Sequence, residues 1–242
     1  MPSRKPTPAV SLLLGSTLLL ALVAAPAVAD TVAQCNLQFD ASWSEENHPT
    51  DFPPNPHFSG LIGGTHNDQV VFWAPGGLAS PGIQQVAETG AKTLFQGEVE
   101  DAILAGSAAE VVSGGGIPLS PGTVSVAFEA DLSHPYLTVV SMIAPSPDWF
   151  VGIHGLPLFE GGRWIEQQVV DLPPYDAGTD SGASYTSADV VTIPPVPIAQ
   201  ITGFPFDGPT SLGTFTVECQ GALVFTDGFE DGTLDAWSAS TP

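Results

Sequence analysis

The sequence predicts a mostly β protein, an antiparallel β-sandwich that carries a short helical insertion. Its 26 glycines and 24 prolines are scattered without a period, which is typical of many turns between short strands. The run TVSVAFEA at 123–130 alternates apolar with smaller or polar side chains, the period of two that a half-buried strand requires. A single segment shows helical spacing instead. Two β layers with inserted helices follow from this pattern.

Seven strands are expected in order along the chain, at 35–43, 69–74, 123–132, 136–144, 150–158, 164–172 and 213–225. Between the second and third of these, residues 82–112 place apolar side chains at roughly helical intervals, with glutamate and glutamine between them. Gly90 and Gly97 are expected to break this segment into two shorter helices. Residues 193–211 hold too many prolines for a central strand and are expected to wrap the edge of the domain.

The N-terminal residues 1–29 have the order of a secretory signal peptide. Arg4 and Lys5 precede an uncharged apolar run, and an Ala-x-Ala motif ends at Ala29. A transmembrane anchor is the alternative, but the polar residues after Ala29 favour cleavage. No later apolar run is long enough to span a bilayer. The expected organisation is a signal peptide at 1–29, one β domain at 30–225 and an acidic tail at 226–242, in a secreted protein.

The chain beyond the signal peptide is strongly acidic. Only Lys92 and Arg163 offset its 26 aspartates and glutamates, so its formal charge is 2 − 26 = −24. This balance excludes nucleic acid as a partner and disfavours unaided binding to anionic membranes. Such a charge suits either a salty medium that screens self-repulsion or the collection of divalent cations. The composition does not choose between the two.

Two cysteines, Cys35 and Cys219, lie near the two ends of the β domain. An even count in an exported protein indicates one disulfide, here between the first and the last expected strand. Two free thiols are the alternative.

The sequence contains none of the common catalytic motifs. G-x-S-x-G, H-E-x-x-H, the phosphate-binding G-x-x-x-x-G-K and C-x-x-C are all absent, and no two of the five histidines have a metal-ligand spacing. A metal-dependent hydrolase with His66 or His154 as its base is the less favoured alternative. We therefore expect a protein that is not an enzyme.

Carboxylates are the more informative polar residues. Asp176 and Asp180 share the loop DLPPYDAGTDSG, and Asp148 lies between prolines and a tryptophan in APSPDWFVGI. Two carboxylates in a tight loop repel each other unless a cation lies between them. Because the strands alternate in direction, both loops should emerge at one end of the sandwich. Oxygen ligands without histidine or cysteine favour calcium over magnesium or zinc.

Several segments of the chain resemble the spondin domain of the F-spondin and mindin family. The resemblance covers about 35–220 and is strongest in MIAPSPDWFVGI, GGRWIEQQVVDLPPYDAGTDSGASYTS, TIPPVPIAQIT and FSGLIGGTHND. It implies a C2-like antiparallel β-sandwich with a calcium ion bound by loops at one end. Asp148, Asp176 and Asp180 match acidic residues of the family motifs, as does Glu129. From the residues alone, Glu129 is more simply an exposed strand residue.

The expected function is that of a non-enzymatic calcium-binding module for cell-surface or matrix adhesion and recognition. Its partner would be an extracellular protein, a glycan or a lipid surface, and calcium-dependent C2-like binding of membranes is the alternative. The protein is expected to be a monomer. The thrombospondin type 1 repeats that accompany this domain in animals are not matched by residues 226–242. Those residues resemble a tail found on exported bacterial proteins, which indicates a bacterial source and a location at the cell surface or in the periplasm.

Overall fold

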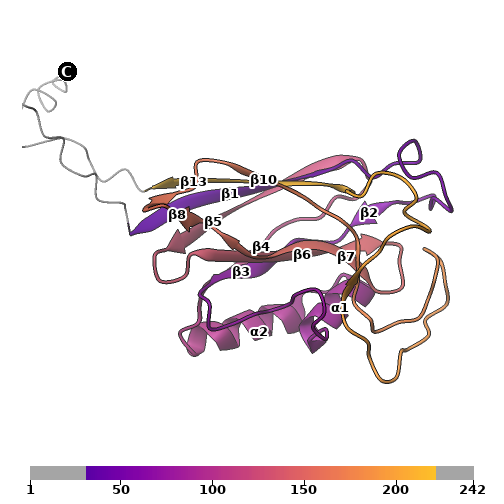
Figure 1. Cartoon of the computed structure of the whole chain (residues 1–242), viewed down its shortest axis with the longest axis horizontal. Helices are drawn as coiled ribbons and strands as arrows, with labels where there is room; N and C mark the ends of the chain where they lie inside the picture. The colour runs from indigo at the N-terminus through magenta and orange to yellow at the C-terminus, as the bar shows by residue number, and fades with distance from the viewer. Residues whose placement is uncertain (1–30, 222–242) are drawn as a thin grey trace, which may run out of the picture.

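The computed structural model describes residues 31–221 as two antiparallel sheets that lie face to face, with two helices against the outer face of one sheet (Figure 1). The β-sandwich with a helical insertion is therefore confirmed. The expected signal peptide at 1–29 and the expected tail at 226–242 lie outside the described residues.

The smaller sheet has four strands in the order β10, β13, β1, β5. Their bounds are Gln168–Asp171, Gly213–Gly221, Val32–Ala41 and Gly122–Asp131. Its central strand β1 alternates buried and less buried side chains along most of its length. This period-two burial follows from a sheet with one face on the core and the other in solvent.

The larger sheet has seven strands and is covered on both faces. Its order is β12, β11, β7, β6, β3, β4, with β2 pairing to β6. In chain order the bounds are β2 His57–Phe58, β3 Ile62–His66, β4 Ala108–Ser113, β6 Tyr136–Ala144, β7 Trp149–Pro157, β11 Tyr175–Asp176 and β12 Ala199–Gln200. Every residue of β6 after Tyr136 is buried, so the strand is apolar almost throughout. A separate hairpin pairs β8 (Phe159–Glu160) with β9 (Arg163–Trp164).

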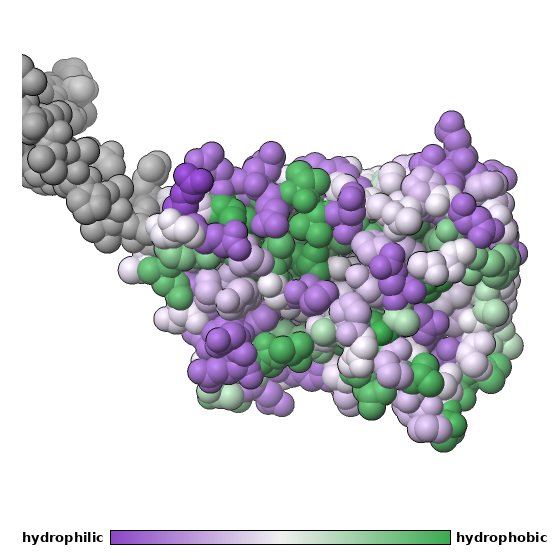
Figure 2. Space-filling view, in the orientation of Figure 1, coloured by the Kyte–Doolittle hydropathy of each residue, from purple (hydrophilic) through white to green (hydrophobic). Residues whose placement is uncertain are grey.

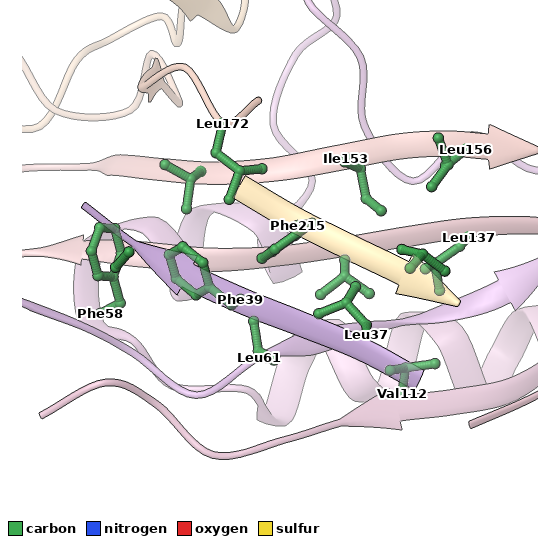
Figure 3. Close-up of a cluster of buried hydrophobic side chains, with 14 of the residues drawn as sticks. Leu37, Phe39, Phe58, Leu61, Val112, Leu137, Ile153, Leu156, Leu172 and Phe215 are labelled. Carbon is green, nitrogen blue, oxygen red and sulfur yellow. The ribbon is translucent and has the colours of Figure 1, made fainter. Parts of the chain in front are cut away.

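The main core fills the space between the two sheets (Figure 3). The ring of Phe39 on β1 packs edge-on against Phe58 and Phe215, with ring centroids 4.8 and 5.1 Å apart. Aliphatic side chains from both sheets surround these rings, among them Leu37 and Leu137. Aromatic side chains that bring large apolar areas together in this way dominate the stability of a core.

The helices cover a second core on the outer face of the larger sheet. Helix α1 (Pro81–Thr89) begins after Ser80, whose hydroxyl accepts a hydrogen bond from the Ile83 N–H, and it ends at Gly90. Helix α2 (Thr93–Leu104) follows it. Phe72 and Trp73, in the loop before α1, pack under the helices together with apolar side chains of the larger sheet, including Phe150.

A disulfide between Cys35 and Cys219 joins the first strand to the last, as expected. The two residues face each other across the β1–β13 ladder, with Cα atoms 4.1 Å apart. Both ends of the described chain therefore lie side by side at one end of the sandwich, at the left of Figure 1. The opposite end carries the β6–β7 turn and the long loops around β11 and β12.

Three local expectations are wrong. Residues 69–74 form no strand but a loop, because Phe72 and Trp73 pack into the helical core instead of pairing. Helix α2 runs through Gly97, which faces open space, and the residues after Leu104 turn into β4. The expected strand 164–172 is divided into β9 and β10. Among residues 31–221, neither helix is long and apolar enough to cross a membrane.

Candidate metal-binding loops

Two loops, the β6–β7 turn and the loop that follows β11, meet at the end of the sandwich away from the disulfide. Asp148 is the last residue of the β6–β7 turn, and Asp176 ends β11 beside Trp149 of β7. The backbone N–H of Ala177 donates to the carbonyl oxygen of Asp148 over 3.1 Å. This pairing carries the following loop, with Asp180, across the Asp148 side chain.

One oxygen of the Asp148 carboxylate organises that loop. Its Oδ2 accepts hydrogen bonds from the backbone N–H groups of Thr179 and Asp180, over 2.7 and 3.0 Å, and from the Thr179 hydroxyl over 3.2 Å. The other oxygen, Oδ1, is buried and has no hydrogen-bond partner within the described protein. Buried polar atoms are nearly always paired, so an unpaired carboxylate oxygen requires an explanation.

The charge of Asp148 is not neutralised by a basic side chain. The residue is 0% exposed, and the single ion pair within residues 31–221 joins Asp131 to His134, elsewhere in the fold. Burial, with a smaller contribution from the negative charge of Asp176, raises the pKa of Asp148 to about 6 against the opposing hydrogen bonds of Asp180 and Thr179. A buried carboxylate without a cation is costly when ionised.

Asp176 and Asp180 each form a tight local turn. Asp176 Oδ1 accepts from the Gly178 N–H over 2.7 Å, and Asp180 Oδ1 accepts from the Gly182 N–H over 2.7 Å. Burial raises the pKa of Asp176, and the charge of Asp180 adds to this effect. The second oxygen of Asp180 accepts from the Val190 N–H over 2.6 Å. Asp180 thus holds the loop ends together with both of its oxygens.

The sequence favours this loop conformation through Gly178. Its φ of +75° lies in the left-handed region that glycine adopts without strain. A Cβ atom at this position would also overlap the carbonyl oxygen of Val196, whose own N–H donates to the Gly178 carbonyl over 2.9 Å. Gly178 therefore lets the chain segment around Val196 lie directly against the acidic loop.

The residues fit a hard cation in part. Within residues 31–221, no group of three or more histidine, cysteine, aspartate or glutamate side chains is arranged to hold a metal ion. The unpaired Asp148 Oδ1 and the adjacent carboxylate of Asp176 are nevertheless the donor type that calcium prefers. Calcium also accepts backbone carbonyl oxygens and water. Asp148 and Asp176 are therefore the side chains that would hold the ion, while Asp180 positions them.

Glu129 lies apart from this group in the described chain, so Glu129 and Asp148 of one chain do not lie around one ion here. Glu129 lies near the end of β5, opposite Gln34, and its carboxylate accepts from the Gln34 side chain over 2.6 Å. Strand β6 begins at that end of the sandwich and reaches the Asp148 turn only after nine residues. At 3.3 Å per residue this separates the two carboxylates by roughly 30 Å.

The two histidines considered as catalytic bases lie away from these carboxylates. His66 pairs with Tyr136 at the start of β6, and its ring bonds the Thr138 hydroxyl and the Asn67 carbonyl, each over 2.8 Å. His154 packs edge-on against Trp73 with ring centroids 4.8 Å apart. Burial lowers the pKa of both rings. Their contacts are those of structural residues.

The sequence reasoning missed two contributors to the site. Thr179, which lies inside the DAGTDSG motif, donates hydrogen bonds from both its N–H and its hydroxyl to Asp148. The segment around Val190 supplies a donor to Asp180 and a backbone bridge at Val191. Its signal in the sequence is a run of residues without charge that begins at Val190, whereas the expected edge-wrapping segment begins only at residue 193.

The sequence is similar to known proteins of one family. The Spondin_N family pattern matches residues 33–211. Spondin-2 of Rattus norvegicus is 37% identical over 175 residues, covering 71% of this chain and 53% of that protein. Spondin-2 of Homo sapiens is 35% identical over 181 residues, covering 72% and 54%. Spondin-1 of Bos taurus is 38% identical over 186 residues, covering 74% and 23%. The chain thus spans about half the length of the Spondin-2 proteins it matches.

Proposed function

The chain belongs to the spondin family and forms a disulfide, which is typical of oxidising compartments, so it is an extracellular protein. We propose that it is a calcium-binding recognition module. The observation that supports this most directly is the Asp148 carboxylate. It is fully buried, lacks a cationic partner among the described residues, and keeps one oxygen unpaired beside Asp176.

Calcium would remove the electrostatic conflict at this site. The ion would draw its side-chain oxygens from Asp148 and Asp176, and its charge would offset their mutual repulsion. Bound calcium would also hold the β6–β7 turn against the loop after β11. In our proposal this ordered end contacts an extracellular partner in adhesion, and the module does so without catalysis.

Calorimetric titration of calcium into the protein tests the metal site. We expect one ion per chain with a dissociation constant on the order of 0.1–1 mM, the range of extracellular calcium modules. Asp176→Asn should weaken binding by about tenfold or more, because it removes a charged ligand from a partly buried site.

Glu129→Gln is the matched control, since it neutralises an acidic residue at the far end of the same domain. It should leave the calcium affinity unchanged. The proposal is wrong if the parent protein shows no binding at millimolar calcium. It is also wrong if the two variants bind calcium equally well.

A further inference from the structure

An exposed apolar segment is attached directly to the acidic loops. Residues 190–197, with the sequence VVTIPPVP, are solvent-exposed except for Thr192, which is half-buried. Ile193 is 85% exposed and Val191 65%. No charged side chain occurs anywhere in residues 190–206, although the chain as a whole carries 26 acidic residues. Exposed aliphatic side chains gathered on one loop usually mark an interaction site.

Hydrogen bonds join the base of the apolar segment to the loop of the proposed calcium site. Val190 donates its N–H to the Asp180 carboxylate, and Ser181 donates its N–H to the Val190 carbonyl over 2.8 Å. Further along, the Thr192 N–H donates to the Thr179 carbonyl over 2.9 Å. The same residues that hold Asp148 therefore also hold the base of the apolar segment.

The surface view shows where this segment lies. Hydrophobic residues gather at the lower right of Figure 2, where Figure 1 draws the orange loop that follows β11. The loop projects from the body of the sandwich, at the end opposite the disulfide and the chain termini.

We propose that residues 190–197 insert into the interface of an anionic lipid membrane when calcium occupies the adjacent site. This inference rests on the proposed function. The exposed side chains are valine, isoleucine and proline, without the aromatic residues and arginine that anchor protein–protein interfaces. A projecting aliphatic loop can instead bury its side chains at the boundary between lipid headgroups and acyl chains, where binding strength scales with the apolar area buried.

Charge explains why calcium would be required. Glu88, Asp180 and Asp189 line a surface pocket of about 180 Å³ together with Val191 of this segment. Together with Asp148 and Asp176 they repel anionic headgroups. Calcium at Asp148 and Asp176 would lower this negative potential and offer positive charge to a lipid phosphate or carboxylate. The apolar segment and the ion would then act on the same membrane surface.

Co-sedimentation with phosphatidylserine–phosphatidylcholine vesicles tests the inference. The parent protein should sediment in millimolar calcium and remain in solution in EGTA or with pure phosphatidylcholine vesicles. The double variant Val191→Ser/Ile193→Ser should lose at least about tenfold in vesicle affinity, because each apolar side chain that leaves the lipid weakens binding by several-fold or more. Its calcium affinity in solution should stay that of the parent.

The matched control is Leu104→Ser/Val169→Ser, which removes two similarly exposed aliphatic side chains, 87% and 59% exposed, from other surfaces. It should sediment like the parent. The inference is overturned if the parent binds calcium in solution but not the vesicles, or if both double variants sediment equally. A flat calcium titration would overturn the proposed function and, with it, the calcium dependence of insertion. Vesicle binding in EGTA that Val191→Ser/Ile193→Ser weakens would then show that the segment inserts without calcium, and no vesicle binding at all would overturn insertion as well.

Discussion

Asp148→Asn is expected to stabilise the protein when calcium is absent. Burial raises the pKa of Asp148 to about 6, against 3.8 for an ordinary aspartate. At neutral pH, this difference corresponds to an energetic cost on the order of 3 kcal/mol for ionising the folded protein. Asparagine removes the charge and keeps one oxygen for the N–H groups of Thr179 and Asp180. We expect a gain of about 1–3 kcal/mol in the free energy of unfolding.

The sign of this effect should depend on pH and on calcium. Between about pH 4 and 6 the folded protein keeps the Asp148 proton that the unfolded chain releases, so the parent loses stability as the pH rises. The advantage of the variant should therefore be small near pH 4 and complete above pH 7. Calcium at 100 times its dissociation constant should stabilise the parent alone, by about 2.7 kcal/mol, and so cancel or reverse the order.

Urea denaturation at several pH values, with EGTA or with calcium, measures these differences. Asp68→Asn is the control, because it removes an exposed charge from a loop elsewhere in the fold. Its stability should follow that of the parent under all conditions. The electrostatic reasoning is refuted if Asp148→Asn is less stable than the parent in EGTA at pH 7.5. A difference between variant and parent that does not change from pH 4 to pH 7 would refute it equally.

The remaining predictions concern the disulfide and the acidic loop. Replacing both Cys35 and Cys219 by serine should lower the free energy of unfolding by up to about 5 kcal/mol, because the disulfide joins residues that are 184 positions apart. Urea denaturation should show the same loss with calcium and without it. Gly178→Ala should lower the free energy of unfolding by at least about 1–3 kcal/mol, since alanine is strained at a φ of +75° and its Cβ would overlap the Val196 carbonyl. The control Gly97→Ala, at a helical site that faces open space, should not destabilise the protein in the same assay.

Local patterns predicted the strands that have clear apolar runs. Strand β6 occupies the expected residues 136–144, because almost all its side chains are apolar and both faces of its sheet are covered. The meeting of the Asp148 and Asp176 loops was also predictable, since it needs only the alternation of strand direction. The disulfide followed from two cysteines in the first and last strands.

Local sequence patterns did not predict structure that depends on contacts between segments distant in the sequence. Strand β3 has the sequence IGGTH, which lacks apolar alternation, yet Gly63 is needed there because a Cβ would overlap the Thr138 carbonyl of β6. No local pattern reveals such a close approach. The position of Glu129 relative to Asp148 could not be read from a family match either, because such a match gives a position in the sequence, whereas strand direction places the end of β5 away from the Asp148 turn.

The bridge between β1 and β13 has a mechanical consequence. Cys35 lies near the start of the first strand and Cys219 near the end of the last, on directly paired positions. A pulling force applied through both flanking segments would pass through the covalent sulfur link and by-pass the hydrogen-bonded ladders between the two cysteines. The domain should then keep its loops folded under tension that would otherwise separate the strands of the smaller sheet.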